Sequence, residues 1–389
     1  MRAPAARADG RQSLRLSVHP GVPPALDALA AGLGDRAFLR AAWFAAAGGE
    51  RTLVAATADG VPLAAFPAAP MGPPALGVAS VPGSYWPFRA VPLAPELGRA
   101  ELEEILSSRT FRSAFGPLWR MGPFYRDDPA AARLVSAAAA SGWTASARRL
   151  GRTFLIDIPT LRAAGPWPTG STLKRVRNYE NRLRRLGEVT FERIAGSDWT
   201  PAAFDALAAI EAASWIASRT DGSGAKFLAS GQGDYWRRVA ADPAVAAMLS
   251  ALVVRVGGRP VAFCFDLNLG SLQYGIAASH DAAFDSFRPG RIATCRNLEW
   301  AIERGIERID LGAGDSGYKA EMGASPGPEI VDMLFIRPPA LAALLRPAWE
   351  ASTSEEGLFG GLREIRLKRR TPTLLAGVVT AAAAVAFLE

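Results

Sequence analysis

The segment Ser286–Ala293 combines residue types that bind anionic groups. It follows an expected strand, Pro289 suits the first turn of a helix, and Gly290 lets a ligand approach the backbone closely. Unpaired N–H groups and the helix dipole favour negative charge at such a start, and Arg288 and Arg291 add two cations. The pattern suggests a pyrophosphate cradle; the alternative is an ordinary proline-started helix with solvated arginines.

Residues that hold metals or form covalent intermediates are scarce. With 2 Cys and 2 His, the sequence predicts no disulfide framework, no cysteine-type zinc site and no poly-histidine metal centre. Cys264 lies inside an expected strand and Cys295 on an apolar helix stripe, so both are expected in the core. The absence of a Ser/His/Asp or Cys/His arrangement argues against nucleophilic catalysis by the enzyme.

Composition is that of a folded protein with an anionic partner. The chain has 389 residues, 49% of them hydrophobic, which is enough for two or three domains with real cores. Lys and Arg number 44 against 37 Asp and Glu, a net charge of +7. This excess suits nucleic acid, a membrane surface or a phosphorylated cofactor. Neither a signal peptide nor an apolar run long enough to span a membrane is present, so we expect a cytoplasmic protein.

The second half contains the elements that must position the cradle. Leu249–Val256, Pro260–Leu269 and Leu272–Ser279 read as strands, and the short turns between them predict antiparallel neighbours. Apolar periodicity predicts helices over Ser171–Leu186, Pro201–Arg219, Asp234–Ala241 and Pro289–Gly305, and further strands over Glu188–Ile194, Ile309–Gly312 and Glu329–Ile336.

The first half alternates strands and helices in a similar way. We expect helices over Phe38–Ala47, Glu96–Ser108 and Pro129–Ser141, and strands over Arg51–Ala58, Val61–Phe66 and Thr153–Ile158. The whole reads as a mixed α/β protein with an N-terminal domain over 1–158, a C-terminal domain over 159–345 and a tail over 346–389.

Short motifs of the second half occur in an order that resembles one family. They are Phe287–Gly290, Trp300–Gly305, Ile309–Asp315 and Tyr318-Lys319, preceded by Arg182–Leu186, Val189–Glu192 and Ser214-Trp215. This succession resembles the CelD/FemAB-like branch of the GNAT acyltransferases, over about Ser171–Arg337. The N-terminal part resembles it more loosely, at Arg133, Gly142-Trp143 and Thr153-Phe154.

The resemblance implies two tandem GNAT-like domains with mixed, largely antiparallel sheets flanked by helices, the first of them degenerate. It implies acyl transfer from an acyl-CoA co-substrate, without a metal, to an amine acceptor. The donor's pantetheine would lie along Leu272–Ser279 and its pyrophosphate on Arg288, Gly290, Arg291, Ile292 and Ala293. Because Ile292 stands where the family usually has Gly or Ala, a carrier-linked donor is the alternative to free CoA.

Catalytic roles follow from the same resemblance and from acid–base chemistry. The reaction needs a base for the attacking ammonium and an acid for the departing thiolate. Tyr318 matches the position of the family's general acid, and His280 is the natural base, with Asp281 and Asp310 as competing carboxylates. Lys319 is a candidate phosphate contact, and Glu211, Trp215 and Tyr274 are candidates for the substrate cleft. A packed or solvated structural role is the alternative for each of these residues.

Basic residues concentrate in the helix over 171–186 and in the tail over 363–388, where they precede an apolar run. A solvated face, a phosphate-rich ligand and an anionic membrane surface are the three readings of the helix. The tail is either a membrane hook or a buried helix. A peripheral association with the cytoplasmic face of the membrane is therefore a hypothesis that depends on these alternatives, and we expect no sequence-specific nucleic acid.

The sequence thus predicts an N-acyltransferase in which the amine attacks the donor thioester directly. The leading hypothesis is transfer of a long-chain acyl group, rather than an aminoacyl group, to a sphingoid or lipid-like amine, since the bacterial ceramide synthases are similar proteins. The alternatives are an acyltransferase on sugar amines of envelope polysaccharide, a FemAB-like aminoacyl-tRNA transferase and a non-catalytic GNAT-fold scaffold.

Overall fold

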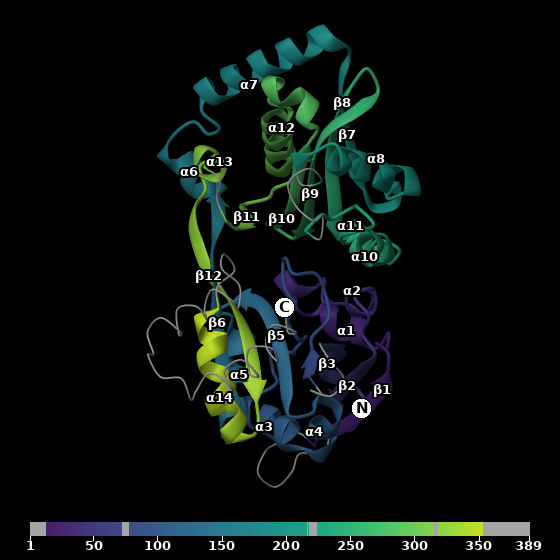
Figure 1. Ribbon diagram of the computed structural model, residues 1–389, viewed down its shortest axis with the longest axis vertical. Coiled ribbons are helices and arrows are strands. Elements are labelled where there is room, and N and C mark those ends of the chain that lie inside the picture. The colour runs from purple at the N-terminus through teal and green to yellow at the C-terminus, as the bar shows by residue number, and fades with distance from the viewer. Residues whose placement is uncertain (1–12, 72–77, 216, 218–223, 315–316, 353–389) are drawn as a thin grey trace, which may run out of the picture. The chain divides into compact units, whose positions relative to one another are not determined.

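The computed structural model describes residues 13–71, 78–215, 217, 224–314 and 317–352, in two compact units (Figure 1). Of the described residues, those within 13–152 and 328–352 form unit 1 and those within 153–327 form unit 2. Strands β6 (Thr144–Asp157) and β12 (Ser325–Ile336) carry the chain across the two borders. The expected borders at 158/159 and 345/346 differ, because β12 pairs with β5 (Leu118–Tyr125) and so returns the chain to unit 1.

Unit 1 is built on a sheet of strand order β1-β2-β3-β4-β5-β12-β6. Its other elements are β1 (Arg15–Pro20), α1 (Leu26–Ala31), α2 (Ala41–Ala45), β2 (Arg51–Ala56), β3 (Pro62–Met71), β4 (Val78–Ser80), α3 (Arg99–Ser107), α4 (Arg109–Phe115), α5 (Pro129–Ala140) and α14 (Pro339–Ala351). Aromatic rings fill its core: Trp119 stacks on Phe335 with centroids 3.9 Å apart and meets Phe111 and Phe115 edge-on.

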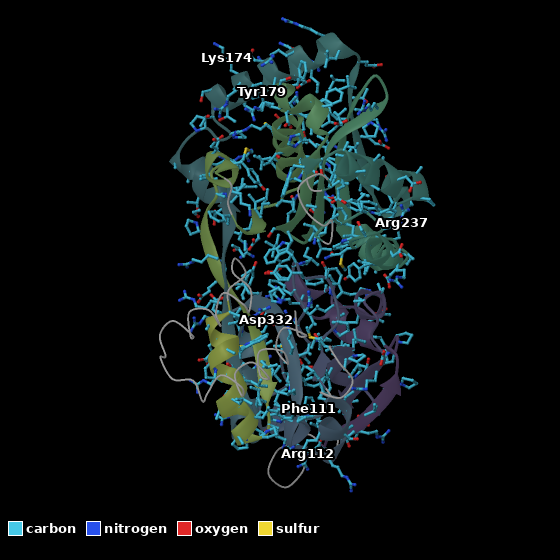
Figure 2. All side chains as sticks on the ribbon, in the orientation of Figure 1. Phe111, Arg112, Lys174, Tyr179, Arg237 and Asp332 are labelled. Atoms are coloured by element: carbon cyan, nitrogen blue, oxygen red, sulfur yellow. The ribbon has the colours of Figure 1, made fainter. Side chains whose placement is uncertain are left out.

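A buried ion cluster also holds unit 1 together. Asp332, labelled in Figure 2, is 0% exposed and accepts hydrogen bonds from Arg120, at 2.5 Å from Nη2, and from Arg148, at 3.0 Å from Nη2. Both guanidinium groups lie over the ring of Trp349 on α14. The cluster therefore ties three neighbouring strands to the helix that covers them.

Unit 2 contains the sheet β6-β11-β10-β9-β8-β7. Its strands are β7 (Val189–Ala195), β8 (Leu249–Val256), β9 (Arg259–Leu269), β10 (Leu272–His280) and β11 (Arg308–Ala313), besides the end of β6. Its helices are α6 (Ile158–Ala164), α7 (Gly170–Leu183), α8 (Pro201–Ala212), α10 (Gly233–Val239), α11 (Pro243–Met248), α12 (Pro289–Glu303) and α13 (Tyr318–Glu321). The predicted antiparallel trio β8, β9 and β10 is confirmed.

Alternation along β9 separates two faces of this sheet. Phe263 and Phe265 meet Phe227, and Phe265 also meets Trp236 of α10. Ala262 and Cys264 instead pack with α7 and α12 in one apolar cluster. Because side chains of a strand alternate in direction, Asp266 falls on the α12 face with Cys264. This alternation brings a carboxylate beneath α12.

Candidate active site

The strands β10 and β11 form an open angle in the middle of unit 2. They pair in parallel only over Leu272–Tyr274 and Arg308–Asp310. On its other side β10 carries an irregularity between Gly275 and Ala277 in its pairing with β9. Bulges of this kind redirect a strand and are frequent next to active sites.

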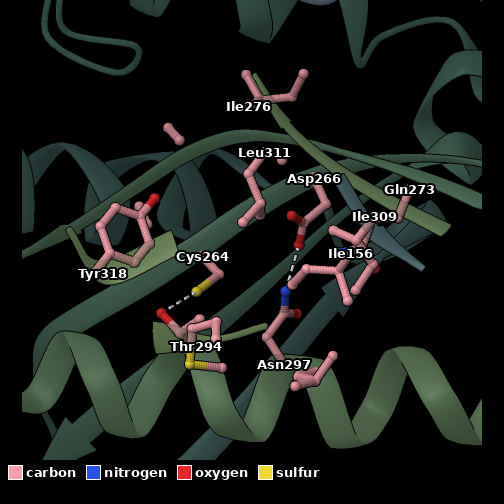
Figure 3. A pocket seen from close by; sticks show the side chains of 15 residues that line it. Ile156, Cys264, Asp266, Gln273, Ile276, Thr294, Asn297, Ile309, Leu311 and Tyr318 are labelled. Carbon is pink, nitrogen blue, oxygen red and sulfur yellow. Dashed lines mark hydrogen bonds between the residues drawn. The ribbon is translucent and has the colours of Figure 1, made fainter. Parts of the chain in front are cut away.

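A pocket of about 160 Å³ lies at this angle (Figure 3). Ile156, Gly275–Ala278, Ile309 and Leu311 line it from the strands, and Leu298 and Met322 close it from the α12 side. The lining side chains that carry polar or sulfur atoms, apart from Met322, are those of Cys264, Asp266, Gln273, Thr294, Asn297 and Tyr318. The pocket is thus mostly apolar with a few polar groups, which is the usual composition of a ligand site.

Asp266 is the most unusual residue of the pocket. It is 4% exposed and accepts a hydrogen bond of 2.9 Å from Asn297 Nδ2. Burial raises the pKa of its carboxyl to about 7, although hydrogen bonds from Gln273 and Asn297 act in the opposite direction. Sequence reasoning missed Asp266. The available signal was a lone carboxylate inside an apolar strand, where Asp is disfavoured.

Asn297 gives the same end of the pocket a second acceptor. Its side chain is buried, and Oδ1 has no hydrogen-bond partner among the described residues. The neighbouring carboxylate fixes the orientation of the amide, since Nδ2 must face Asp266. An unsatisfied buried acceptor is costly, so Oδ1 is suited to accept from a ligand.

The two cysteines are buried, as predicted. Cys264 Sγ lies 3.9 Å from Thr294 Oγ1, and Thr294 in turn donates to Gly290 O at 2.9 Å. Burial raises the pKa of the Cys264 thiol far above its usual value. Cys264 is therefore a lining residue rather than a nucleophile.

Tyr318 lines the pocket from the first position of α13. Figure 3 shows its ring beside Cys264 and Thr294, whereas Gln273 and Ile309 lie at the other end. Lys319, its neighbour, is 5% exposed and donates to the carbonyls of Leu311, Gly312 and Ala313 at 2.8–3.0 Å. These contacts use the three hydrogens of the ammonium, so Lys319 holds the loop after β11 in place. They do not support the predicted contact between Lys319 and a donor phosphate.

The start of α12 brings several predicted residues together. Arg288 precedes it in the left-handed conformation, with φ of 57°. His280 packs against Gly290, where a Cβ would lie 3.1 Å from the Nδ1 atom of the histidine. Arg291 forms an ion pair with Glu321, which lowers the pKa of that carboxyl. Ile292 and Ala293 are 0% exposed and belong to the core beneath the helix.

The three candidate bases do not line the pocket. His280 Nε2 lies 2.7 Å from Asp285 Oδ1, near the α12 start. Asp281 caps the turn that follows β10, accepting from Ala283 N at 2.9 Å, and pairs with Arg259. Asp310 is 0% exposed and accepts from Gly312 N at 2.8 Å.

The candidate cleft residues Glu211, Trp215 and Tyr274 also lie outside the pocket lining. Tyr274 is 0% exposed and, by strand alternation, faces away from Gln273. The carboxylate of Glu211 accepts backbone N–H groups of Lys226 and Phe227 at 2.9 and 2.7 Å, while burial raises its pKa. Trp215 is 52% exposed.

The basic helix of the sequence analysis corresponds to α7 and the turn over Arg184–Leu186 that follows it, and Arg175, Arg177 and Arg185 of this segment are exposed. The predicted tail over 363–388 lies outside the described residues. Within the described ranges, no helix is long and apolar enough to span a bilayer. The described residues likewise contain no cluster of three His, Cys, Asp or Glu side chains suited to a metal ion.

Comparison with known proteins identifies the elements around this pocket. Residues 170–320 match the family model described as an acetyltransferase (GNAT) domain. No curated protein sequence matches the chain significantly.

Solved structures resemble the chain at low sequence identity. The C-terminal domain of an Agrobacterium fabrum protein described as a lysylphosphatidylglycerol synthetase is 18% identical, with a TM-score of 0.50 over 82% of this chain and 93% of that one. FemX is 11% identical, with 0.49 over 76% and 90%. A tandem GNAT protein from the clavulanic acid biosynthesis pathway is 14% identical, with 0.47 over 84% and 99%.

The predicted α/β class is confirmed, and the family match runs from the start of α7 into α13 and includes the open angle and most of the pocket lining. Residues 170–320 therefore have the fold of a GNAT domain.

Proposed function

We propose that this domain transfers a short acyl group from a CoA-type thioester to an amine. The main support for the proposal is the pocket where β10 and β11 separate, with Tyr318 in its lining. An extended thioester can hydrogen-bond to the edge that β10 exposes where β11 departs, as an added strand would. The α12 start then faces the donor's phosphates.

Donor binding would rest on the α12 start. Pro289 has no N–H, and the N–H groups of Arg291 and Ile292 donate to the carbonyl of Arg288, so the backbone donor that the start of the helix offers is the N–H of Gly290. The side chains of Arg288, Arg291 and His280 lie around this point. A pyrophosphate here would gain charge-assisted hydrogen bonds and the favourable end of the helix dipole. CoA as the donor agrees with the GNAT family match.

The transfer itself is one substitution at the thioester carbonyl. The amine nitrogen forms a bond to the carbonyl carbon, the carbon–sulfur bond breaks, and the thiolate leaves. Tyr318 would supply the proton that converts the thiolate to a thiol, and the proton lost by nitrogen restores the tyrosine through solvent. The products are an amide and a free thiol.

The pocket volume bears on acyl length. An apolar cavity of about 150 Å³ in another protein holds one benzene molecule. The pocket of about 160 Å³ therefore suits an acyl group of similar size. This supports a short-chain donor over the long-chain donor of the ceramide synthase hypothesis, and it favours the sugar-amine alternative among the acceptors.

The experiment is an acyl-transfer assay that follows thiol release from acyl-CoAs of increasing chain length with a sugar amine or a sphingoid amine. We expect release with short donors only. Tyr318→Phe should lower kcat by roughly a hundredfold without weakening donor binding, because the ring stays and only the acid is lost. Tyr179→Phe on α7 is the matched control and should behave as the wild type.

Full activity of Tyr318→Phe would remove Tyr318 from the reaction. Thermal stabilisation that grows up to long-chain donors would restore the lipid hypothesis. A chain that neither binds nor turns over any acyl-CoA would instead be a scaffold with a GNAT fold.

A further inference from the structure

Three successive contacts between the strands β9 and β10 and the helix α12 mark positions from the start of the helix into the pocket. His280 meets Gly290 at the start of α12. Cys264 and Thr294 meet one helical turn further on, opposite Ala278 of β10. Asp266 and Asn297 meet next, opposite Gly275. From Gly290 to Asn297 the helix rises by about 10 Å, at roughly 1.5 Å per residue.

This order assigns the two ends of the pocket to different parts of the donor. The inference rests on the proposed function, in which the phosphates lie at Gly290 and the thioester lies near Tyr318. Tyr318 is beside the Cys264–Thr294 pair (Figure 3). A donor that runs inward from Gly290 past Tyr318 then presents the far end of its acyl group to Asp266 and Asn297.

That inner end offers acceptors to a ligand. Asp266 has a buried carboxylate, and Asn297 Oδ1 is buried without a partner among the described residues. The amide hydrogens of Asn297 face Asp266 instead of the ligand. A methyl group placed here would leave Asn297 Oδ1 unsatisfied and the carboxylate of Asp266 without a counter-charge, at a desolvation cost, whereas an ammonium would donate to both groups and neutralise the charge.

We propose that the inner end of the pocket, formed by Asp266 and Asn297, selects a short acyl group that carries an amino group at its far end. The carboxylate of Asp266 pairs with the ammonium, and Asn297 Oδ1 accepts a second hydrogen bond from it. The apolar walls from Ile156, Ile309 and Leu298 surround the intervening methylenes.

A rival role for Asp266 is that of general base for the acceptor amine. The two roles differ in what a substitution changes. Loss of a base lowers kcat for every donor alike, since the acceptor is the same. Loss of the ammonium partner changes the preference between donors that differ only at their far end.

The test uses β-alanyl-CoA and butyryl-CoA, whose acyl groups have the same length and differ only by ammonium against methyl. We expect the wild-type chain to bind β-alanyl-CoA about tenfold more tightly or better, because one charge-assisted hydrogen bond is worth at least that. Asp266→Asn and Asn297→Leu should each bring the ratio of the two dissociation constants to about one or below. Thr294→Val, at the middle of the pocket, should leave the ratio as in the wild type.

Equal or tighter binding of butyryl-CoA by the wild-type chain would overturn the inference while leaving the proposed function intact. An unchanged ratio in Asp266→Asn, with kcat lowered for both donors, would overturn it in favour of the base. Failure of both donors to bind would overturn the inference and the proposed function together. If Asp266→Asn does not fold, the ratio of the two dissociation constants in Asn297→Leu tests the inference instead.

Discussion

Asp266 is a buried carboxylate in the pocket of unit 2. It follows an apolar run, Val261–Phe265, within its strand, and it is 4% exposed. A buried carboxylate without a cationic partner is expensive to ionise, which is why burial raises its pKa to about 7. Such a cost is maintained only where the group has a use, as titratable groups in pockets often do.

This pKa predicts how Asp266 affects stability. In the unfolded chain the carboxyl ionises near pH 3.9, while in the folded chain it keeps its proton up to pH of about 7. Between these values the folded state binds more protons, so stability falls as pH rises from about 4 to 7. The cost is fully present above pH 7 and absent below pH 4.

Asp266→Asn should therefore be more stable than the wild type at pH 8, by on the order of 4 kcal/mol at most, since each unit of pKa is worth about 1.4 kcal/mol. The difference should vanish near pH 4. Urea unfolding at several pH values measures it. A variant less stable than the wild type at pH 8 would contradict the assignment.

At the scale of elements, the start of α12 is the unusual feature. Helix N-caps normally have extended backbone, whereas Arg288 has φ of 57°. A side chain other than glycine pays about 1–2 kcal/mol for this conformation. Strain of this kind is typical of functional sites, and here it falls at the proposed phosphate contact.

Arg288→Gly separates the two effects. Glycine adopts this conformation freely, so the fold should keep its stability or gain up to about 1 kcal/mol. The affinity for CoA should nevertheless fall by about tenfold, because a guanidinium contact to phosphate is lost. Thermal denaturation and CoA titration measure the two quantities.

The control for Arg288→Gly is Arg238→Gln, which removes the same charge from the exposed surface of α10. It should leave CoA affinity unchanged. Equal affinities for CoA in Arg288→Gly and wild type would exclude Arg288 from the donor site.

Strands and helices bounded by clear turn or start residues were predicted from the sequence, and a strand interrupted by such residues was not. β8, β9 and β10 have apolar runs bounded by glycine turns, and α12 starts with Pro289. β5 was missed because Gly122 and Pro123 interrupt it and argue against a strand. Gly122 is needed there: a Cβ at this position would lie 2.6 Å from Asp332 Oδ1. The glycine inside this strand is therefore explained by its close contact with Asp332, which is far from it in the sequence.

At the scale of the whole molecule, unit 1 depends on contacts between distant segments. Asp332 of β12 lies between Arg120 of β5 and Arg148 of β6, and all three side chains are buried. A single carboxylate compensates two guanidinium groups that burial would otherwise make costly.

Asp332→Asn should lower the stability of unit 1 by roughly 3–5 kcal/mol, since it leaves two buried arginines without their anion. Hydrogen exchange of amides in β5 and β12 measures the loss. Glu329→Gln is the matched control, because this carboxylate of the same strand also pairs with two arginines, Arg126 and Arg149, which are 60% and 72% exposed. It should cost about 1 kcal/mol or less. Equal costs would contradict a structural role for the buried cluster.

The sequence by itself determined the α/β class, the antiparallel trio and the helix opened by Pro289, because local patterns and motifs carry this information. Only the tertiary structure placed His280 beside Gly290 and showed that Lys319 donates to three backbone carbonyls. Only the tertiary structure assigned residues 328–352 to unit 1. It also joined Asp266 to Asn297 across 31 residues. The physical reason is that burial and partnership of a polar group depend on which strands and helices pack together, and no local pattern encodes that packing.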